Sequence, residues 1–244
     1  MKRRAEFLFA AALALSLAIV SCRPLFHRQV SGIVLQVEGR VEASTKDKGF
    51  RLTNHSRLYP GTLIDVPAGD RVDLKLLPGI LVEGTGESQI QIEQLRLSRD
   101  GDETIRPMIA REATLRLTHG TLLLSVGRAP THSRLRVVTP FGTLTTGAGR
   151  VCKLTVTAAG GRVLSVRGIN SFAPVSGGPP VQVGAGFFYE APGSNRPPQP
   201  ASQSGSEAEA ELADTLIAEG RLLRIGRERE PFVPWKQERE ASDP

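Results

Sequence analysis

The sequence predicts an all-β body, built either of stacked hairpins in a solenoid-like fold or as a sandwich-like fold, with a C-terminal helix after a Pro/Ser-rich linker. Three observations lead to this fold class. Short apolar stretches with period-two alternation recur from about residue 31 to residue 189. Glycine (25) and proline (17) are abundant among the 244 residues, which indicates many chain reversals. No segment with the length and periodicity of a helix separates the alternating stretches.

Residues 1–21 have the features of an export signal. Three basic residues precede an apolar stretch from Phe7 to Val20, which as a helix would span about 21 Å, less than the roughly 30 Å of a hydrocarbon core. The stretch ends in the sequence IVSC at residues 19–22, which resembles the lipobox of bacterial lipoproteins. The resemblance implies cleavage between Ser21 and Cys22, acylation of the Cys22 thiol and a stable lipid anchor.

Two alternatives to lipidation stay open. Residues 16–18 offer a small-x-small site for an ordinary secretory signal, and an uncleaved signal anchor would need no cleavage. Arg23, rather than Asp, follows Cys22, so the resemblance to lipoproteins implies delivery to the outer membrane, with the body facing the periplasm. Residues 22–29 are then expected to form a short tether.

The predicted body, residues 30–190, consists of about seven similar cells. Each cell has an apolar-x-apolar strand, a short turn with glycine and a second apolar strand, as in the passage from Leu115 through Gly120 to Leu122. The glycine is expected to supply the positive-φ turn at which the next strand returns. The polar segment Ser98–Arg111 is expected to be an exposed loop between two halves of the body.

After the body, residues 191–205 are predicted to form a Pro/Ser-rich linker and residues 206–244 a charged helical tail. Ser206 and Glu209 have the spacing of a capping box, and Gly220 is expected to end the helix. An extension beyond Gly220 stays open because three apolar residues follow it: Leu222, Leu223 and Ile225. A narrow apolar stripe is expected to dock on the body or on a partner: Leu212, Leu216 and Ile217.

Charge divides the chain into a basic body and an acidic tail. Residues 22–204 carry 22 basic and 14 acidic groups, a net charge of +8, whereas residues 205–244 carry 6 and 10, a net charge of −4. A basic body favours an anionic partner, which would be an envelope protein, an anionic glycopolymer, lipid headgroups or the acidic tail itself. Export and the scarcity of aromatic residues (5 %) both oppose a nucleic-acid partner.

Four cations are the candidate binding residues. They alternate with apolar residues in the predicted strands and are therefore expected to share the outward face of the body: Lys75, Arg116, Arg134 and Arg136. The alternative is that they only keep the sheet soluble and blunt its edges, since charged outward faces are the normal condition.

The sequence shows no catalytic constellation, so neither an enzyme nor a metal or cofactor site is expected. The four histidines are scattered and lack the short spacing of metal ligands. Cys152 lies in an alternating apolar stretch and is expected to be a small, partly buried residue. Asp65, Asp70 and Asp73 are expected at turn and outward positions, because a calcium loop needs a denser series of oxygens.

Four passages, taken in order, resemble the FecR-type periplasmic domain: residues 58–79, 87–92, 115–126 and 138–142. The last of them, VTPFG, is similar to the most recognisable signature of that domain. The resemblance covers residues 30–190. Residues 148–151 and 165–170 depart from the family's pattern, and the core is expected to differ there.

The best-known FecR-type proteins are transmembrane regulators that act on a sigma factor through a cytoplasmic N-terminal domain. Only six residues precede the apolar run here, so the resemblance implies the exported β module without that arm. The sequence predicts a non-enzymatic envelope lipoprotein whose β body binds a partner or has a structural role. Two alternatives stay open: an envelope polysaccharide-acting enzyme, and a signalling accessory that senses a periplasmic partner. The scarcity of Trp and Tyr opposes the enzyme, because sugar-binding clefts usually present such platforms.

Overall fold

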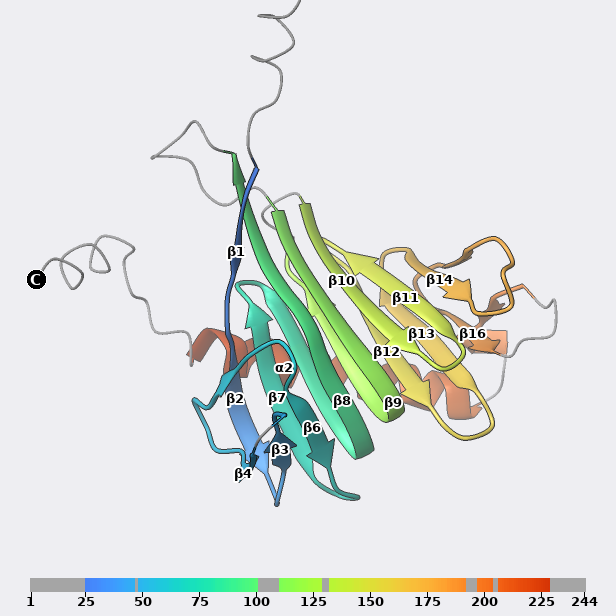
Figure 1. Cartoon of the computed structure of the whole chain (residues 1–244). Helices are drawn as coiled ribbons and strands as arrows, with labels where there is room; N and C mark the ends of the chain where they lie inside the picture. The colour runs from blue at the N-terminus through green and yellow to red at the C-terminus, as the bar shows by residue number, and fades with distance from the viewer. Residues whose placement is uncertain are drawn as a thin grey trace, which may run out of the picture.

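The computed structural model describes residues 25–46, 48–100, 110–128, 132–191, 197–203 and 206–228. It confirms an all-β body with a C-terminal helix, since 17 strands precede the helix α2 (Ser206–Glu228) (Figure 1). Of the two arrangements left open, the structure has the sandwich-like one, because the sheet folds over on itself around one core. Within the described ranges no helix is long and apolar enough to cross a membrane.

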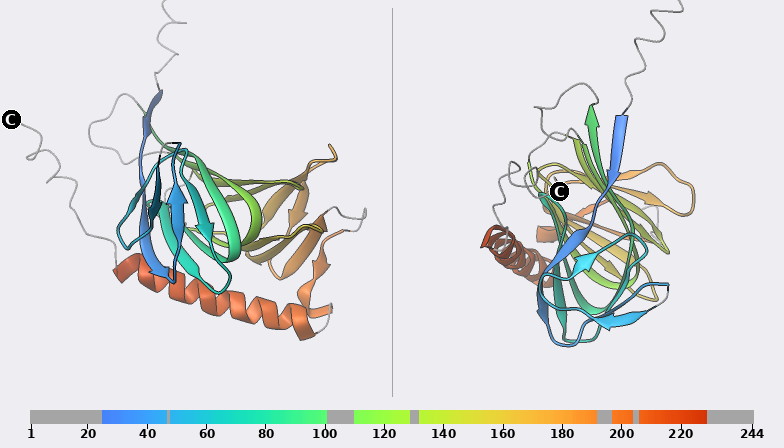
Figure 2. Two further views of the ribbon diagram at one scale, coloured as in Figure 1. Left: turned by 60° about the horizontal axis from the view of Figure 1, so that its bottom comes forward. Right: turned by 60° about the vertical axis from the view of Figure 1, so that its left-hand side comes forward.

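The folded sheet has two layers that share its longest strands, β8 (Ile80–Asp100) and β9 (Ala110–Val126) (Figure 2). The second half of β8 and the first half of β9 pair in one layer, which we call the open layer; the other two halves pair in the helix-side layer, which α2 covers. The open layer also contains β1 (Leu25–Gln29), β3 (Glu42–Ser44), β4 (Gly49–Arg51), β6 (Leu63–Val66), β10 (His132–Thr139), β11 (Gly142–Gly147), β14 (Asn170–Pro174) and β15 (Val181–Val183). The helix-side layer also contains β2 (Gly32–Glu38), β5 (Arg57–Leu58), β7 (Arg71–Leu77), β12 (Val151–Val156), β13 (Gly161–Arg167), β16 (Phe187–Ala191) and β17 (Gln199–Pro200).

One apolar cluster fills the space between the layers. It joins Leu74 and Leu124 of the helix-side layer to Ile92, Leu115 and Val137 of the open layer, and all five side chains are fully buried. Since side chains alternate along a strand, the residues between these point away from the core. They face solvent on the open layer and α2 on the helix-side layer.

Strands β8 and β9 bend where they pass from one layer to the other, and the hydrogen bonds of Ser88 stabilise this bend, which we call the corner. The buried Ser88 hydroxyl accepts a hydrogen bond from the Thr121 N–H at 2.9 Å and donates one to the Thr85 carbonyl. Beside it, Gly120 has a φ of 103°, and a Cβ at Gly120 would lie 2.1 Å from Ser88 Oγ. The expected reversal at Gly120 is therefore wrong: β9 bends there and continues into the other layer.

Three segments expected to lack regular structure contribute to the sheet. Leu25–Gln29, within the expected tether, forms β1 and pairs antiparallel with the end of β8. In the expected linker, Gln199–Pro200 pairs with β16, and the following Ala201, in the short 3-10 helix η1 (Ala201–Gln203), is buried. The expected loop Ser98–Arg111 is shorter than predicted, because β8 extends to Asp100 and β9 begins at Ala110.

Helix α2 continues past Gly220, its expected end, to Glu228. The last turns are stabilised by packing: Leu222 and Ile225 are buried in a second apolar cluster with Leu35 of β2, Leu81 of β8, Leu123 of β9 and Val151 of β12. This burial outweighs the cost of about 1 kcal/mol that glycine imposes in a helix interior. The open alternative, extension through Leu222 and Ile225, is thus the correct one.

Only one of the three residues of the expected apolar stripe of α2 docks on the body. Leu212 is partly buried, but Leu216 and Ile217 are 48 % and 70 % exposed. The buried side of the helix runs through Ala208, Thr215, Glu219, Leu222 and Ile225, at intervals of seven, four, three and three residues. Two of these five residues are polar, so hydrophobicity alone does not reveal the docked side.

Candidate functional site

Strand β10 presents two arginines on the outer face of the open layer. Its residues alternate between exposed and buried, so Leu135 enters the core while Arg134 and Arg136 point outward, as the sequence predicts. β10 runs parallel to β9 and antiparallel to β11, which makes the outer faces of the three strands continuous. In this ladder Arg136 is flanked by Thr114 of β9 and Thr145 of β11.

Arg116 lies on the same outer face but has a partner. It is next to Val138 of β10 in the parallel ladder, which places it in line with Arg136. Its guanidinium Nη2 and Nε lie 2.6 and 2.7 Å from Glu93 Oε1 on β8. The charge of Arg116 is thus compensated within the chain.

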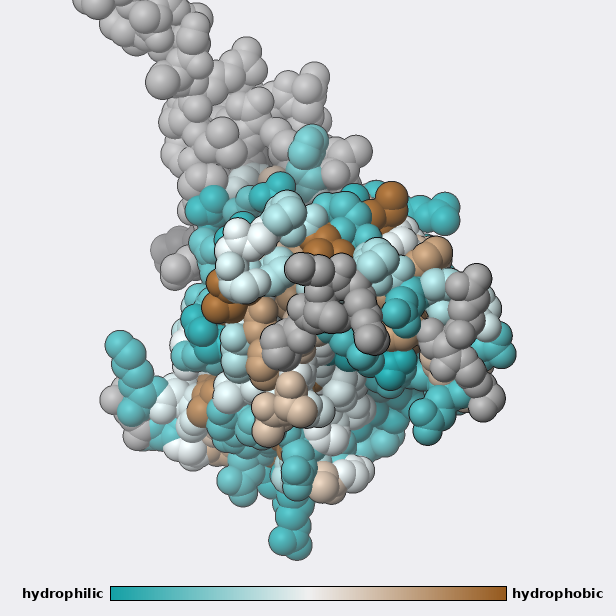
Figure 3. All heavy atoms as spheres, turned by 90° about the vertical axis from the view of Figure 1, so that its right-hand side faces the viewer, coloured by the Kyte–Doolittle hydropathy of each residue, from teal (hydrophilic) through white to brown (hydrophobic). Residues whose placement is uncertain are grey.

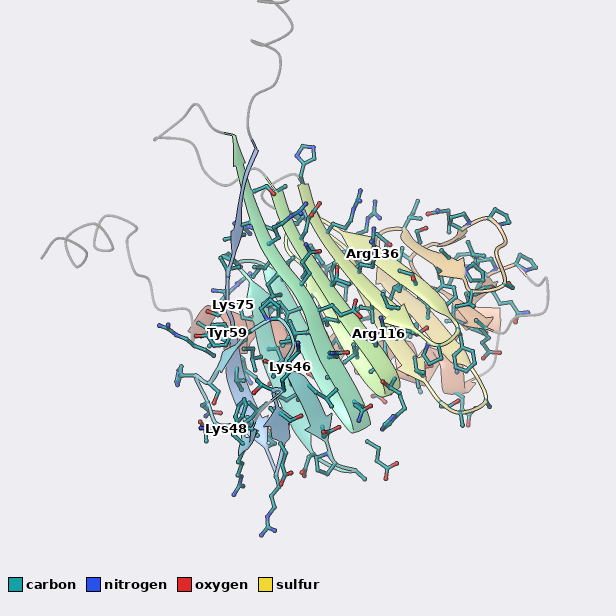
Figure 4. The ribbon with its side chains drawn as sticks, in the orientation of Figure 1. Lys46, Lys48, Tyr59, Lys75, Arg116 and Arg136 are labelled. Atoms are coloured by element: carbon teal, nitrogen blue, oxygen red, sulfur yellow. The ribbon has the colours of Figure 1, made fainter. Side chains whose placement is uncertain are left out.

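Lys75 does not join the other three cations. It lies on β7 in the helix-side layer, opposite Leu81, whose side chain packs with α2. Figure 4 shows Lys75 apart from Arg116 and Arg136. The expectation that all four share one face is therefore wrong, because the sheet folds over between β7 and β10.

A second basic surface, on β12 and β13, is covered by the acidic helix. Lys153 Nζ and Arg162 Nη2 lie 3.0 and 3.2 Å from the two carboxylate oxygens of Glu211. Further along α2, Arg167 Nη2 lies 3.1 Å from Glu219 Oε1. The acidic tail thus neutralises one face of the basic body. The tail is one of the anionic partners that the charge distribution predicted for the body.

Arg134 and Arg136 have no compensating partner in the part of the chain that the structure describes. No carboxylate of the described residues forms an ion pair with either of them. The nearest acidic neighbour in the ladder, Glu112, pairs with Arg96 at 3.0 Å. A pocket of about 580 Å³ lies beside Arg134, and its lining includes Glu112, His132, Thr145, Thr146 and Arg150. The uncompensated pair and its threonine neighbours form the candidate site, which we call the arginine face (Arg134, Arg136, Thr114, Thr145).

The carboxyls that sequence reasoning missed lie beneath α2. Asp73, expected to point outward, is 0 % exposed, and neither of its oxygens accepts a hydrogen bond among the described residues. Burial raises its pKa from 3.8 to about 6, and Glu83 acts in the same direction, while Arg71 and Arg221 lower it. Arg221 of α2 binds Glu83, and Asp73 is the neighbour of Glu83 in the β7–β8 ladder, so both carboxyls lie on the side of the sheet that faces the helix.

Cys152 is part of the apolar core of the folded chain. It is fully buried, and burial raises the pKa of its thiol to about 12. A thiol is nucleophilic only as the thiolate, so Cys152 belongs to the core rather than to a reactive site. Among the described residues no three metal-ligating side chains gather. Ser21 and Cys22, the predicted cleavage and lipidation site, lie outside the described residues.

Apolar residues do not gather at the end of the sandwich where the two layers part. Figure 3 shows them scattered among hydrophilic ones on the part of this face that is not grey.

Two solved structures, both of a "putative anti-sigma factor" from Parabacteroides distasonis, are similar to part of this chain. The TM-scores are 0.40 and 0.39 at 12 % sequence identity. Each match covers 54 % of this chain and only 56 % or 57 % of the other. No family model matches the chain, and no curated protein matches it. The FecR-type resemblance stays a prediction.

Proposed function

We propose that this protein is a non-enzymatic binding module of the cell envelope that holds an acidic partner protein on its arginine face. The observation that carries the proposal is the pair Arg134 and Arg136, two outward guanidinium groups without an ion-pair partner among the described residues. Guanidinium groups suit carboxylates because their planar forks of donors form paired hydrogen bonds with them.

The distribution of charge over the two layers supports this proposal. The body has a net charge of +8, and the helix-side layer is compensated by Glu211 and Glu219 of α2. The tail therefore leaves the open layer as the basic side of the molecule. Such a face steers an acidic partner during encounter, and its attraction falls off beyond about 8 Å at physiological ionic strength.

The residues around the arginines favour a protein over a polysaccharide. Strands β9, β10 and β11 contain no Phe, Tyr or Trp on which a sugar ring would stack. Thr114 and Thr145 instead add hydroxyl groups that donate to and accept from a polypeptide. The outer face is a sheet surface, which suits a partner of matching flat shape.

A charge reversal with a matched control tests the proposal. A photo-crosslinking residue at Thr143, on β11 beside the site, would report on the neighbour of this face in intact envelopes. We expect one reproducible protein adduct at low salt, less of it at high salt, and at least about tenfold less in the double variant Arg134→Glu with Arg136→Glu. The control reverses two exposed lysines near the β3–β4 hairpin, Lys46→Glu with Lys48→Glu (Figure 4), and should leave the adduct unchanged.

Two results would contradict this function. An adduct that forms equally in both double variants, at low and at high salt, would exclude the arginine face as the binding site of the partner. An adduct that contains polysaccharide rather than protein would replace the proposed class of partner. Circular dichroism of both variants should match that of the unmodified chain, because all four side chains are exposed.

The setting of the module is part of the same proposal. Cys22 would carry the lipid anchor, and the body would face the periplasm from the outer membrane. The FecR-type resemblance favours a partner that belongs to a signalling system, which makes the protein a signalling accessory; a purely structural partner is the alternative. An envelope polysaccharide-acting enzyme is supported by none of the observations above.

A further inference from the structure

Helix α2 lies along the outside of the body, so that one of its sides faces away from the sheet (Figure 2). The outward side carries an apolar centre that the described elements leave uncovered. Ile217 and Leu216 are 70 % and 48 % exposed, and Ala213 and Gly220, about one turn to either side, are exposed as well. The other side of the helix is fixed to the body by ion pairs of Glu211 and Glu219 and by the apolar cluster around Leu222. The exposed side therefore cannot turn inward without breaking these contacts.

Charges of opposite sign lie at the two ends of this outward side. Glu207, Glu209 and Asp214 are exposed in the N-terminal half, and Arg224 and Arg227 are exposed in the C-terminal half. None of these five side chains forms an ion pair within the described part of the chain. The distribution agrees with the helix dipole, and it also makes the helix complementary to itself in the antiparallel orientation.

We propose that the outward side of α2 pairs antiparallel with α2 of a second copy of this chain, about a two-fold axis between Leu216 and Ile217. In that register Leu216 faces Ile217 of the second copy, and Ala213 faces Gly220 of the second copy. Glu209 faces Arg224 of the second copy, and the symmetry repeats each contact. One helix surface thus supplies both halves of the interface, as an isologous contact requires.

The pairing is self-consistent in geometry. Positions 209, 213, 216, 220, 224 and 227 follow one another at intervals of three or four residues and so lie on one side of a helix. Small residues at 213 and 220 allow the two backbones to approach closely around the larger pair. A single helix pair buries less than the roughly 800 Å² per partner of a standard stable complex, so we expect a dimer that dissociates readily.

The mixed charges favour a second protein chain over a lipid surface. Anionic headgroups would attract Arg224 and Arg227 but repel Glu207, Glu209 and Asp214 on the same side. Membrane-surface helices carry mainly Lys and Arg on their polar face. A partner helix with the reverse order of charges satisfies both ends, and the second copy provides that order.

Disulfide trapping locates the axis. In the full chain, Ile217→Cys places two thiols beside the two-fold axis, so mild oxidation should give a covalent dimer on a non-reducing gel. Glu207→Cys is the matched control: its two copies would lie about 28 Å apart along the helices, well beyond the roughly 7 Å that a disulfide can bridge. Cys22 and the buried Cys152 are present in both variants and in the unmodified chain, which gives the background.

A charge swap tests the register in solution. Arg224→Glu alone and Glu209→Arg alone should each weaken dimerisation about tenfold in sedimentation equilibrium, because each turns two attractions into repulsions. The double variant should recover the affinity of the unmodified chain. The proposal is overturned if Ile217→Cys gives no dimer above background, if Glu207→Cys crosslinks equally well, or if the double variant is weaker than either single one. Flotation with anionic vesicles that depends on Ile217, without crosslinking, would assign the surface to a membrane instead.

Discussion

Arg221 of α2 places its Nη2 2.7 Å from both carboxylate oxygens of Glu83 on β8, a residue 138 positions earlier in the chain. Glu83 is nearly buried, and its neighbour in the β7–β8 ladder is the fully buried Asp73. The guanidinium of Arg221 is therefore the cation that α2 contributes to a buried pair of carboxyls. This contact joins the tail to the body at a buried pair of carboxyls.

Removing that cation should destabilise the fold. In Arg221→Ala the buried Glu83 carboxylate loses its partner, and we expect the free energy of unfolding to fall by about 2–3 kcal/mol. Urea unfolding followed by circular dichroism measures the change. Arg116→Ala is the control, because the Arg116–Glu93 pair is half-exposed and should contribute less than about 1 kcal/mol. Equal losses in the two variants would show that burial of Glu83 does not govern the effect.

Asp73 should make the fold more stable at mildly acidic pH. Its pKa is about 6 in the folded chain, against an ordinary value of 3.8 for the unfolded chain, so the folded chain binds the proton more tightly. The free energy of unfolding should therefore rise as the pH falls from above 6 towards 4 and gain nothing further below 4 from this group. The full effect is at most about 3 kcal/mol, at about 1.36 kcal/mol for each unit of pKa.

The variant Asp73→Asn isolates this effect. It should stabilise the chain at pH 7.5 by about 2–3 kcal/mol and flatten the rise of stability between pH 6 and 4. Denaturant titrations at several pH values measure both changes. Asp65→Asn, the same substitution at an exposed position of β6, is the control. A profile that keeps its slope in Asp73→Asn would assign the titration to another group.

The corner between the layers should tolerate no side chain at Gly120. In Gly120→Ala the new Cβ would lie 2.1 Å from Ser88 Oγ at a φ of 103°, so we expect a loss of about 3 kcal/mol or more in urea unfolding. Gly86→Ala is the matched control, since it has a φ of 58° with no atom within 4 Å of the added Cβ. It should cost only about 1 kcal/mol. Similar losses at both sites would mean that backbone strain, not the contact with Ser88, decides the outcome.

Two glycines of α2 should respond in opposite directions to alanine. Gly220 is exposed, with nothing within 4 Å of an added Cβ, so Gly220→Ala should stabilise by about 0.5–1 kcal/mol. Gly226 faces Leu81, where an added Cβ would lie 2.8 Å from Cδ1, so Gly226→Ala should destabilise despite its better helix propensity. Thermal unfolding of the two variants gives the signs. A gain of stability in both would show that the contact with Leu81 relaxes without cost.

The alternation of apolar and polar residues predicted the strands better than it predicted the connections between them. Alternation correctly indicates that Leu135 is buried in β10 and that Arg134 and Arg136 point outward. It cannot show that Gly120 bends a strand rather than reversing it, because a glycine with positive φ serves both purposes. Whether the strand bends or reverses at Gly120 depends on Ser88, which is distant in sequence. The Ser88 hydroxyl bonds to the Thr121 N–H beside Gly120 only in the folded sheet.

The same reasoning explains which site residues were predicted. Arg134 and Arg136 belong to one strand, so period two suffices to place them together. The sequence places Lys75 on the same face because the alternation of apolar and polar residues does not show that the sheet folds over between β7 and β10. The docked side of α2 was missed because Glu219 and Arg221 are polar; the opposite net charges of body and tail were the signal that pointed to it.

Cys152 and Cys22, the two cysteines of the chain, together test the predicted anchor. Cys152 is fully buried, and burial raises the pKa of its thiol to about 12, so it should not react with a thiol reagent while the chain is folded. It should react after unfolding in guanidinium chloride. A Cys22 thiol that carries diacylglycerol would react in neither condition, because its sulfur is already bonded to carbon.

Counting reactive thiols on the full chain purified from bacterial membranes therefore decides between lipidation and its alternatives. With a lipidated Cys22 we expect no reactive thiol in the folded chain and one after unfolding. An uncleaved signal anchor, which keeps Cys22 as a free thiol, should give a second reactive thiol after unfolding. The variant Cys152→Ser removes the buried thiol, so any reactivity that remains belongs to Cys22. A reactive thiol that remains in that variant would contradict the lipid anchor on Cys22. The absence of a reactive thiol, together with a mass increase on the N-terminal peptide, would support the lipid anchor.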